Sequence, residues 1–178
     1  MKIFLHVCCG PCTAFPLTVL REEGHQVEGH FFNPNIHPLR EFSRRLAALE
    51  DLSRQMNFPV IYDRQYGLRD FLRKIVFHEE SRCGLCYAMR LEATAIKAVE
   101  QGADAFTTTL LYSKYQNHPL IKSQSEKLAE KYGIPFYYRD FREGWQEGID
   151  MSKEMELYRQ PYCGCIYSEE ERYDKSRR

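Results

Sequence analysis

The chain has 178 residues, with 25 basic and 25 acidic side chains, and 43% of its residues are hydrophobic. This length predicts a single domain over residues 1–178 with an ordinary core. The zero net charge excludes a global field that attracts nucleic acid and leaves room only for a local basic face. We expect no signal peptide and no membrane span, because the first apolar run is short, and we therefore expect a cytoplasmic protein.

Hydrophobic periodicity and turn residues predict strands that alternate with helices along the whole chain. Strands are expected at residues 3–7, 26–32, 59–62, 104–111 and 135–138, and helices at 12–23, 39–56, 66–77, 82–101, 121–132 and 151–157. The charged tail, residues 169–178, is expected to be a solvated helix or a frayed end. Five alternating strands imply an α/β fold, a three-layer sandwich around a five-stranded parallel sheet.

The turn after the first strand carries three thiols, in the order His6-Val-Cys8-Cys9-Gly-Pro-Cys12. In a parallel α/β sheet, ligands bind where a strand ends and the next helix begins. The polar segments that follow the other strands belong to the same edge of the sheet. We therefore expect residues 8–12, 83–86 and 163–165 to meet there.

Seven cysteines occur in the sequence, and they form three closely spaced groups. These are Cys8-Cys9 with Cys12, Cys83-x-x-Cys86, and Cys163-x-Cys165. In a reducing compartment, paired cysteines are more often metal ligands or redox catalysts than structural staples. An isolated cysteine is commonly a small buried hydrophobe, but this interpretation fits three such groups poorly.

Cys83 and Cys86 open a predicted helix, where unpaired amides and the helix dipole favour the thiolate form that binds metal.

Three kinds of site could use these thiols: a thioredoxin-like dithiol, a structural zinc site and an iron–sulfur cluster. A thioredoxin-like dithiol fits Cys9-Gly-Pro-Cys12 literally but leaves the other thiols unused. A structural zinc site needs only four ligands and leaves three thiols unexplained.

An iron–sulfur cluster takes four thiolates, for which we select Cys8, Cys9, Cys83 and Cys86. This choice leaves Cys163 and Cys165 as a redox pair or as ligands of another metal. A disulfide between them would close a small, strained and easily reduced ring. Cys12 has no assigned role.

Several motifs together resemble the epoxyqueuosine reductases of the QueH family. They are HVCCGPC, FFNPNIHP, the RC-x-x-C helix start, FTTTL, RDF and LYRQ-x-YCGC-x-x-S, in this order. The resemblance covers nearly the whole chain, and it departs at Tyr115, where a less bulky polar residue is expected. It implies a HUP-like fold, related to PP-loop and adenine nucleotide hydrolase-like proteins, in which thiols replace the phosphate loop. No ATP use is expected, since no SGGxDS-like or GxxxxGK[ST] sequence is present.

The resemblance also implies a reaction, in which epoxyqueuosine at the tRNA wobble position is reduced to queuosine without cobalamin. It implies a [4Fe-4S] cluster on Cys8, Cys9, Cys83 and Cys86, and a second, mononuclear iron nearby. Cys163 and Cys165 would be the redox-active pair or would bind that iron, with Asp140 as a candidate carboxylate ligand. The segment around residues 157–168 would close the metal site. The electron donor is an unidentified low-potential partner.

An iron acting as a Lewis acid can stabilise the oxygen that leaves an epoxide, and a proton must then reach it. Tyr162, Asp140, His6 and His37 are the candidate proton donors, and a buried residue satisfied by hydrogen bonds is the commoner alternative for each.

A splayed anticodon nucleotide needs aromatic rings for its bases and arginines for its phosphates. The candidate tRNA-binding residues are Arg44, Arg45, Arg82, Arg142, Arg159 and Tyr112, with Tyr115 and Tyr162 beside them. The competing class is a non-catalytic protein that binds metal or senses redox state.

Overall fold

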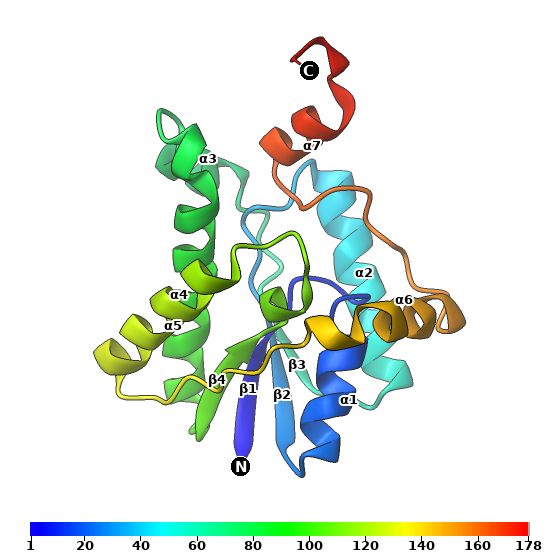
Figure 1. Ribbon diagram of the computed structural model, residues 1–178, viewed down its shortest axis with the longest axis vertical. Coiled ribbons are helices and arrows are strands. Elements are labelled where there is room, and N and C mark those ends of the chain that lie inside the picture. Colours follow the sequence, from blue (N-terminus) through cyan, green and yellow to red (C-terminus); the bar gives the residue numbers. More distant parts are fainter. Residues whose placement is uncertain (178) are drawn as a thin grey trace.

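The structure is a computed structural model that describes residues 1–177. Its described part contains a four-stranded, all-parallel sheet with the strand order β3-β2-β1-β4. The strands are β1 (Lys2–His6), β2 (Gln26–Phe31), β3 (Val60–Tyr62) and β4 (Ala105–Thr108). Because the strands are parallel, their carboxyl ends meet at one edge of the sheet, toward the top of Figure 1.

Helices cover both faces of the sheet, with α1, α2 and α6 on one side and α4 and α5 on the other (Figure 1). The helices are α1 (Ala14–Glu22), α2 (Leu39–Gln55), α3 (Leu68–Ile75), α4 (Arg82–Glu100), α5 (His118–Tyr132), α6 (Trp145–Glu154) and α7 (Ile166–Tyr173). Four short 3₁₀ helices join them in the described chain: η1 (Glu79–Ser81), η2 (Thr109–Tyr112), η3 (Arg142–Gly144) and η4 (Lys175–Arg177). Within residues 1–177, no helix is long and apolar enough to cross a membrane.

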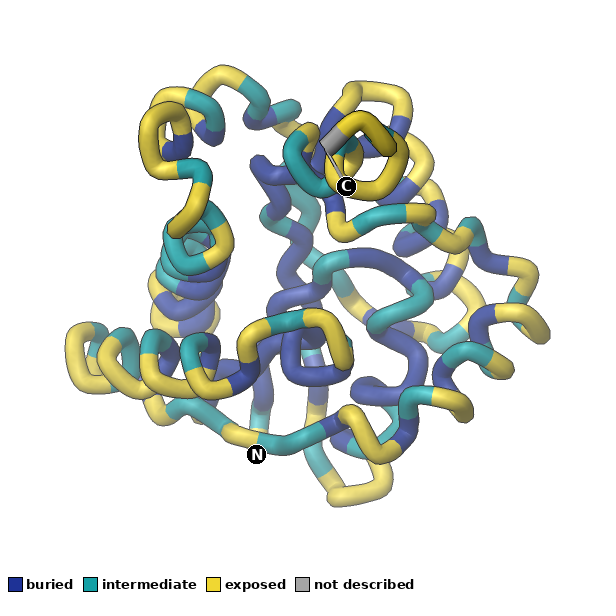
Figure 2. The backbone as a smooth tube through the Cα atoms, turned by 45° about the horizontal axis from the view of Figure 1, so that its top comes forward, coloured by how far each residue is buried: buried dark blue, intermediate teal, exposed yellow. Residues whose placement is uncertain are grey.

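β1 is buried on both faces, as is typical of a central strand in a parallel sheet. Its alternating side chains divide between two cores. Ile3 and Leu5 join the core formed with α1 and α2, whereas Phe4 packs with Ala95 and Ala98 of α4. The sheet and the loops at its carboxyl edge form the buried interior, as Figure 2 shows, and exposed residues gather on the outer helices. This arrangement confirms the predicted α/β architecture.

The predicted fifth strand at residues 135–138 is wrong. This segment forms only an isolated bridge between Phe106 and Phe136. The amide of Phe106 donates to Pro135 O at 3.0 Å, and the amide of Tyr137 donates to Phe106 O at 2.8 Å. Pro135 has no amide hydrogen to extend the pairing, which is why the sheet stops at four strands in the described chain.

Several other boundaries differ from expectation, and the helix predicted at 121–132, for example, begins at His118. The strand predicted at residues 104–111 ends at Thr108, because the Thr108 hydroxyl accepts the amide of Leu110 and turns the chain into η2. The helix predicted at 151–157 lies earlier in the chain and spans Trp145–Glu154. The tail is helical over α7 and mostly exposed, as predicted, and residue 178 lies outside the described residues.

Candidate metal and redox site

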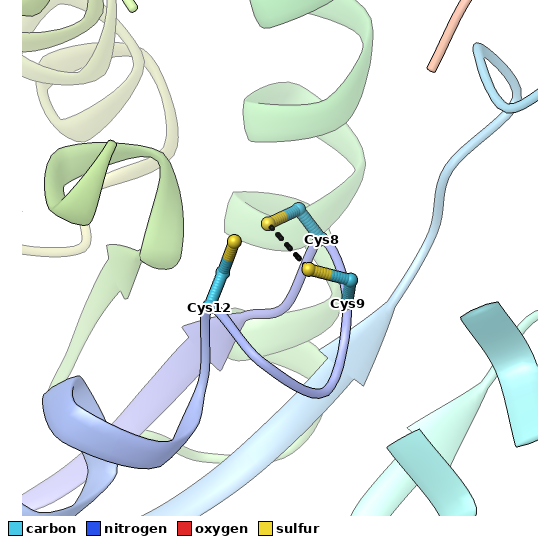
Figure 3. Close-up of side chains that lie close together, drawn as sticks. All are labelled: Cys8, Cys9 and Cys12. Atoms are coloured by element: carbon cyan, nitrogen blue, oxygen red, sulfur yellow. Dashed lines mark hydrogen bonds between the residues drawn. The ribbon is translucent and has the colours of Figure 1, made fainter. Parts of the chain in front are cut away.

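Cys8, Cys9 and Cys12 lie in the turn between β1 and α1, at the carboxyl end of a central strand (Figure 3). Their Sγ atoms all lie within 4.8 Å of one another, and those of Cys8 and Cys9 are 3.8 Å apart. Thr13 closes the turn, donating its amide to Gly10 O at 2.9 Å and its hydroxyl to Cys9 O at 2.7 Å. In the described chain this trio is the one group of three or more metal-binding side chains that converges so closely.

The turn fits tightly between its neighbours. A Cβ atom at Gly10 would lie 2.6 Å from the carbonyl oxygen of Ala48 in α2, so only glycine fits without backbone movement. On the other side, the Thr109 hydroxyl accepts the amide of Cys8 at 3.0 Å and donates to its Sγ at 3.2 Å. The position of Cys8 is therefore determined by Thr109 of η2 and by the packing of the turn against α2.

The three thiols share their protons because they are so close. Hydrogen bonds from Cys12 and Cys9 hold the pKa of Cys8 well below its ordinary value, and the charge of Arg90 acts in the same direction. Burial raises the pKa of Cys9, and the hydrogen bond to Cys8 raises the pKa of Cys12. The trio thus favours one thiolate, at Cys8, and two thiols that would release protons on binding a metal.

Cys83 and Cys86 lie in the first turn of α4, as predicted, with Cys83 exposed and Cys86 partly buried. The expectation that the helix start makes them thiolates is wrong for the free thiols. Burial raises the pKa of Cys86 to about 12, and it also raises the pKa of Cys83. The desolvation of these thiols outweighs the nearby charges of Arg82 and Arg90.

The third thiol pair lies on a segment that we call the C-terminal strap, residues 157–165, which runs from α6 to α7 (orange in Figure 1). The strap lies beside the first trio, since Gln160 Nε2 is 3.0 Å from Cys9 Sγ and 3.5 Å from Cys12 Sγ. Cys163 is exposed and accepts a hydrogen bond from Gln116 Nε2 at 3.4 Å, whereas Cys165 is buried.

Arg45 of α2 holds the strap in place. Its Nη1 donates to Cys163 O at 2.7 Å, its Nη2 to Tyr162 O at 2.8 Å, and its Nε to Glu41 Oε1 at 2.7 Å. Arg45 is only 2% exposed. Gly164 lies at a φ of 157°, and a Cβ there would meet a neighbouring side chain at 2.8 Å. Arg45 thus holds the strap against α2, and Gly164 allows it to lie close to Asn35 in the loop before α2.

Arg90 of α4 lies between the thiol groups and is 2% exposed. Its Nη1 donates to Cys86 Sγ at 3.7 Å and its Nη2 to Asn33 Oδ1 at 2.8 Å, while Asn33 Nδ2 donates to Val7 O at 2.9 Å. Burial lowers the pKa of Arg90, but nearby sulfurs outweigh this effect and raise it overall. Those sulfurs belong to Cys86, Cys8 and Cys163, one from each thiol group.

The structure places Asp140 away from the trio and Tyr162 on the strap. Asp140 accepts Arg142 Nε at 2.9 Å, and this contact lowers the pKa of Asp140 to about 2. Tyr162 donates its hydroxyl to the carbonyl of His37, and its ring lies under Arg45 with 5.4 Å from guanidinium carbon to ring centroid. Burial raises the pKa of Tyr162 to about 12.

Among the described residues, the five predicted tRNA-contacting arginines differ in their surroundings. Arg44 and Arg159 are exposed, Arg82 pairs with Glu171, and Arg142 pairs with Asp140. Arg45 was expected to contact RNA, but it is buried, and its donors are taken up by Glu41 and the strap. Tyr112 is also buried, at 3% exposure, so it lies behind the surface rather than on it.

Comparison with known proteins identifies the family. The family model described as "Epoxyqueuosine reductase QueH" matches residues 3–171. The chain belongs to the QueH family. An epoxyqueuosine reductase QueH from Dehalococcoides mccartyi is 37% identical over 174 residues, covering 98% of this chain and 96% of the relative. One from Thermotoga maritima is 35% identical, covering 97% of this chain and 93% of the relative.

A solved structure confirms the fold of this QueH-family chain. It is the crystal structure of a protein from Methanocaldococcus jannaschii, titled a "predicted subunit of tRNA methyltransferase". The two share 16% sequence identity with a TM-score of 0.58, over 86% of this chain and 76% of the other. At this identity the likeness concerns the fold alone.

Sequence reasoning missed the polar residues that connect the thiol groups of this QueH-family protein. Arg90 follows Cys86 by four residues, so helical spacing alone places both on one face of α4. That signal was available in the sequence. Gln116 and Gln160 carry no such signal, because each meets its cysteine only through the tertiary fold.

Proposed function

We propose that this chain reduces epoxyqueuosine at the wobble position of tRNA to queuosine, without cobalamin. Its membership of the QueH family supports the substrate and the reaction. The observation that supports the proposal in this chain is the thiol trio in the turn after β1, against which the strap that carries Cys163 packs through Gln160. Arg90, buried in contact with Cys86, has its pKa raised by sulfurs of all three thiol groups. A structural metal site needs only four ligands and would leave three of the seven thiols without a role.

We propose Cys8, Cys9, Cys83 and Cys86 as ligands of a [4Fe-4S] cluster. Cys8 and Cys9 already converge, whereas Cys83 and Cys86 lie outside the 4.8 Å group in the described chain. Thiolates are the ligands that such clusters prefer. Arg90 Nε is buried beside the thiols and has no hydrogen-bond acceptor in the described structure. A free donor at this position is expected if a sulfide of the bound cluster would accept its hydrogen bond. A bound cluster would supply electrons one at a time.

We assign the redox exchange to Cys163 and Cys165. Removing the epoxide oxygen as water consumes two electrons and two protons and leaves a carbon–carbon double bond. A dithiol that closes to a disulfide releases the same two electrons and two protons. Cys163 is exposed and hydrogen-bonded to Gln116, so its sulfur is accessible to a substrate. An unidentified low-potential donor would then restore the two thiols.

We propose Tyr162 as the proton donor. Burial raises its pKa to about 12, so the phenol holds its proton at neutral pH, and its hydroxyl would turn from the carbonyl of His37 to the leaving oxygen. Asp140 was also a candidate proton donor, but the hydrogen bonds from Arg142 lower its pKa to about 2, so it is a carboxylate at neutral pH. Asp140 therefore does not serve as an acid, and it would bind a second iron as an anionic ligand only by releasing Arg142.

The proposal is tested on protein purified without oxygen, by iron and sulfide analysis and by mass spectrometry of nucleosides from epoxyqueuosine-containing tRNA. We expect about four irons and four sulfides per chain, and iron in excess of sulfide if a separate iron is present. Cys163→Ser should abolish queuosine formation and keep the visible absorbance. Cys83→Ser should lose both.

The Cys12→Ser variant is the matched control, because Cys12 lies in the trio but is outside the proposed ligand set. If Cys12→Ser loses the visible absorbance and Cys83→Ser keeps it, then Cys12 is a cluster ligand in place of Cys83. Loss of it in Cys163→Ser would move Cys163 into the ligand set. A colourless protein that binds zinc, or that only exchanges disulfides, would instead indicate a non-catalytic metal protein or a thioredoxin-like dithiol enzyme.

A further inference from the structure

A row of three aromatic rings runs from the surface toward the thiols. Tyr115, on the loop after η2, is 85% exposed, and its ring meets Trp145 edge-on with 5.7 Å between centroids. Trp145, the first residue of α6, stacks on Tyr112 with 5.1 Å between centroids and 29° between planes. Tyr112 itself is 3% exposed. The row therefore begins in solvent and ends inside the protein.

The inner end of this row, Tyr112, belongs to the buried core against which Cys8 and Cys12 of the first thiol trio pack. Burial raises the pKa of Tyr112, and the charges of Cys12 and Cys9 raise it further. The Tyr112 hydroxyl donates to the carbonyl of Trp145 at 2.9 Å, which fixes the two rings relative to each other. A ligand on the outer rings would consequently be held next to the candidate active site.

Two cations flank the row, and neither forms an ion pair in the described structure. Lys114 Nζ lies 5.8 Å from the centroid of the Trp145 ring, and the charge of Arg159 acts on Tyr112. Both side chains are exposed. By contrast, Arg142 is occupied by Asp140. Free positive charge beside exposed aromatic rings is the combination that binds single-stranded nucleic acid, since bases stack and phosphates pair.

We propose that Tyr115, Trp145 and Lys114 form a stacking platform for an unpaired base of the tRNA anticodon loop. This inference rests on the proposed function, and it names the surface that holds the loop while the modified nucleoside reaches the thiols. Arg159 and Lys114 would contact the phosphates on either side of the stacked base. Arg45 and Tyr112 were expected to contact tRNA, but both are buried. We assign the contacts to Tyr115, Trp145 and Lys114 instead.

The chain offers a direct probe, because Trp145 is its only tryptophan. We would titrate the full-length protein with an unmodified anticodon stem-loop RNA and follow the tryptophan fluorescence and the binding affinity. A base stacked on Trp145 should quench its emission. A duplex RNA with the sequence of the stem alone presents no unpaired base and should bind more weakly with little quenching.

Tyr115→Ala should weaken stem-loop binding about tenfold, because one stacking contact is lost. Lys114→Ala should lower the slope of log affinity against log salt by about one, because one phosphate contact is lost. Phe77→Ala is the matched control: Phe77 is a 90% exposed aromatic side chain in the turn after α3, across the molecule from α6 (Figure 1). It should bind like the wild type.

The outcomes distinguish failure of the stacking platform from failure of the proposed function. If the wild type binds the stem-loop while its fluorescence stays constant and Tyr115→Ala binds equally well, the platform is wrong and the proposed function stands. Equal binding of the duplex and the stem-loop would also overturn the platform. If the wild type binds neither the unmodified stem-loop nor tRNA carrying epoxyqueuosine, both the platform and the proposed function fail.

Discussion

His30 of β2 faces α4 at 5% exposure, and its Nδ1 is 3.0 Å from the Thr94 hydroxyl. Burial lowers its pKa to about 4. His37 is shifted to about 4 and His6 is lowered as well, in both cases chiefly by burial. The imidazoles around the sheet edge are therefore neutral at physiological pH. This makes His6 and His37 poor proton donors for the proposed reaction.

A pH dependence of stability follows from His30. In the unfolded chain a histidine takes up its proton near pH 6.5, whereas the folded His30 does so only near 4. The contribution of neutral His30 to stability is therefore present above pH 6.5 and is lost as the pH falls toward 4. This loss amounts to at most about 3 kcal/mol.

Urea denaturation at a series of pH values measures this effect. His30→Gln should flatten the decline in unfolding free energy between pH 6.5 and 4. His78→Gln serves as the control, because His78 is exposed, and it should leave the decline unchanged. An equal slope in wild type and His30→Gln would contradict the assignment.

At the scale of the element, α6 shows how packing overrides helix propensity. A Cβ at Gly144 would lie 2.0 Å from the Phe15 ring, and one at Gly148 would lie 2.3 Å from the Tyr112 hydroxyl. Glycine disfavours a helix by about 1 kcal/mol relative to alanine. Here it allows α6 to approach the aromatic rings closely, and that contact stabilises the helix.

Gly148→Ala should consequently destabilise the protein although alanine favours helices. We expect a net loss of about 1–2 kcal/mol in unfolding free energy, since overpacking outweighs the gain in propensity. The tryptophan emission should also shift, because Tyr112 stacks on Trp145. Glu147→Ala, at an exposed neighbouring position, should change stability by less than about 0.5 kcal/mol. A stabilised Gly148→Ala would show that the Tyr112 ring moves freely.

At the scale of the whole molecule, the strap joins the two ends of the chain across the site. Arg45 links α2 to Cys163 and Tyr162, and Gln160 links the strap to the first thiol turn. The Glu41 carboxylate is shared between Arg45 and the Tyr158 hydroxyl at 2.6 Å. The position of Cys163 therefore depends on a buried ion pair more than 100 residues away in sequence.

Arg45→Met should release this link. It leaves the buried Glu41 without its counter-charge and should lower the unfolding free energy by about 3–5 kcal/mol. Amide hydrogen exchange should increase within residues 157–165, because two strap carbonyls lose their donors. Arg40→Met, at an exposed position of α2, should alter neither property. Recovery of stability in the double variant Arg45→Met/Glu41→Leu would attribute the loss to the unpaired carboxylate.

The sequence by itself determined the alternation of strands and helices, the three thiol groups and the family resemblance. These features are local: a buried strand such as β1 shows in five consecutive residues, and Cys83-x-x-Cys86 shows in four. The extra strand at 135–138 was predicted wrongly, because β-propensity does not reveal how many backbone hydrogen bonds a segment that starts with Pro135 forms with the neighbouring strand.

Only the tertiary structure decided which side chains meet at the sheet edge. The sequence predicts Arg45 as a surface arginine, yet the strap covers it, and its buried guanidinium donates hydrogen bonds that hold the strap. Gln160 reads as an ordinary polar residue, yet it lies against Cys9. Contacts between residues so distant in sequence depend on loop paths and packing, which leave no periodic pattern in the chain. Local chemistry was therefore readable from the sequence, whereas the assembly of the site required the fold.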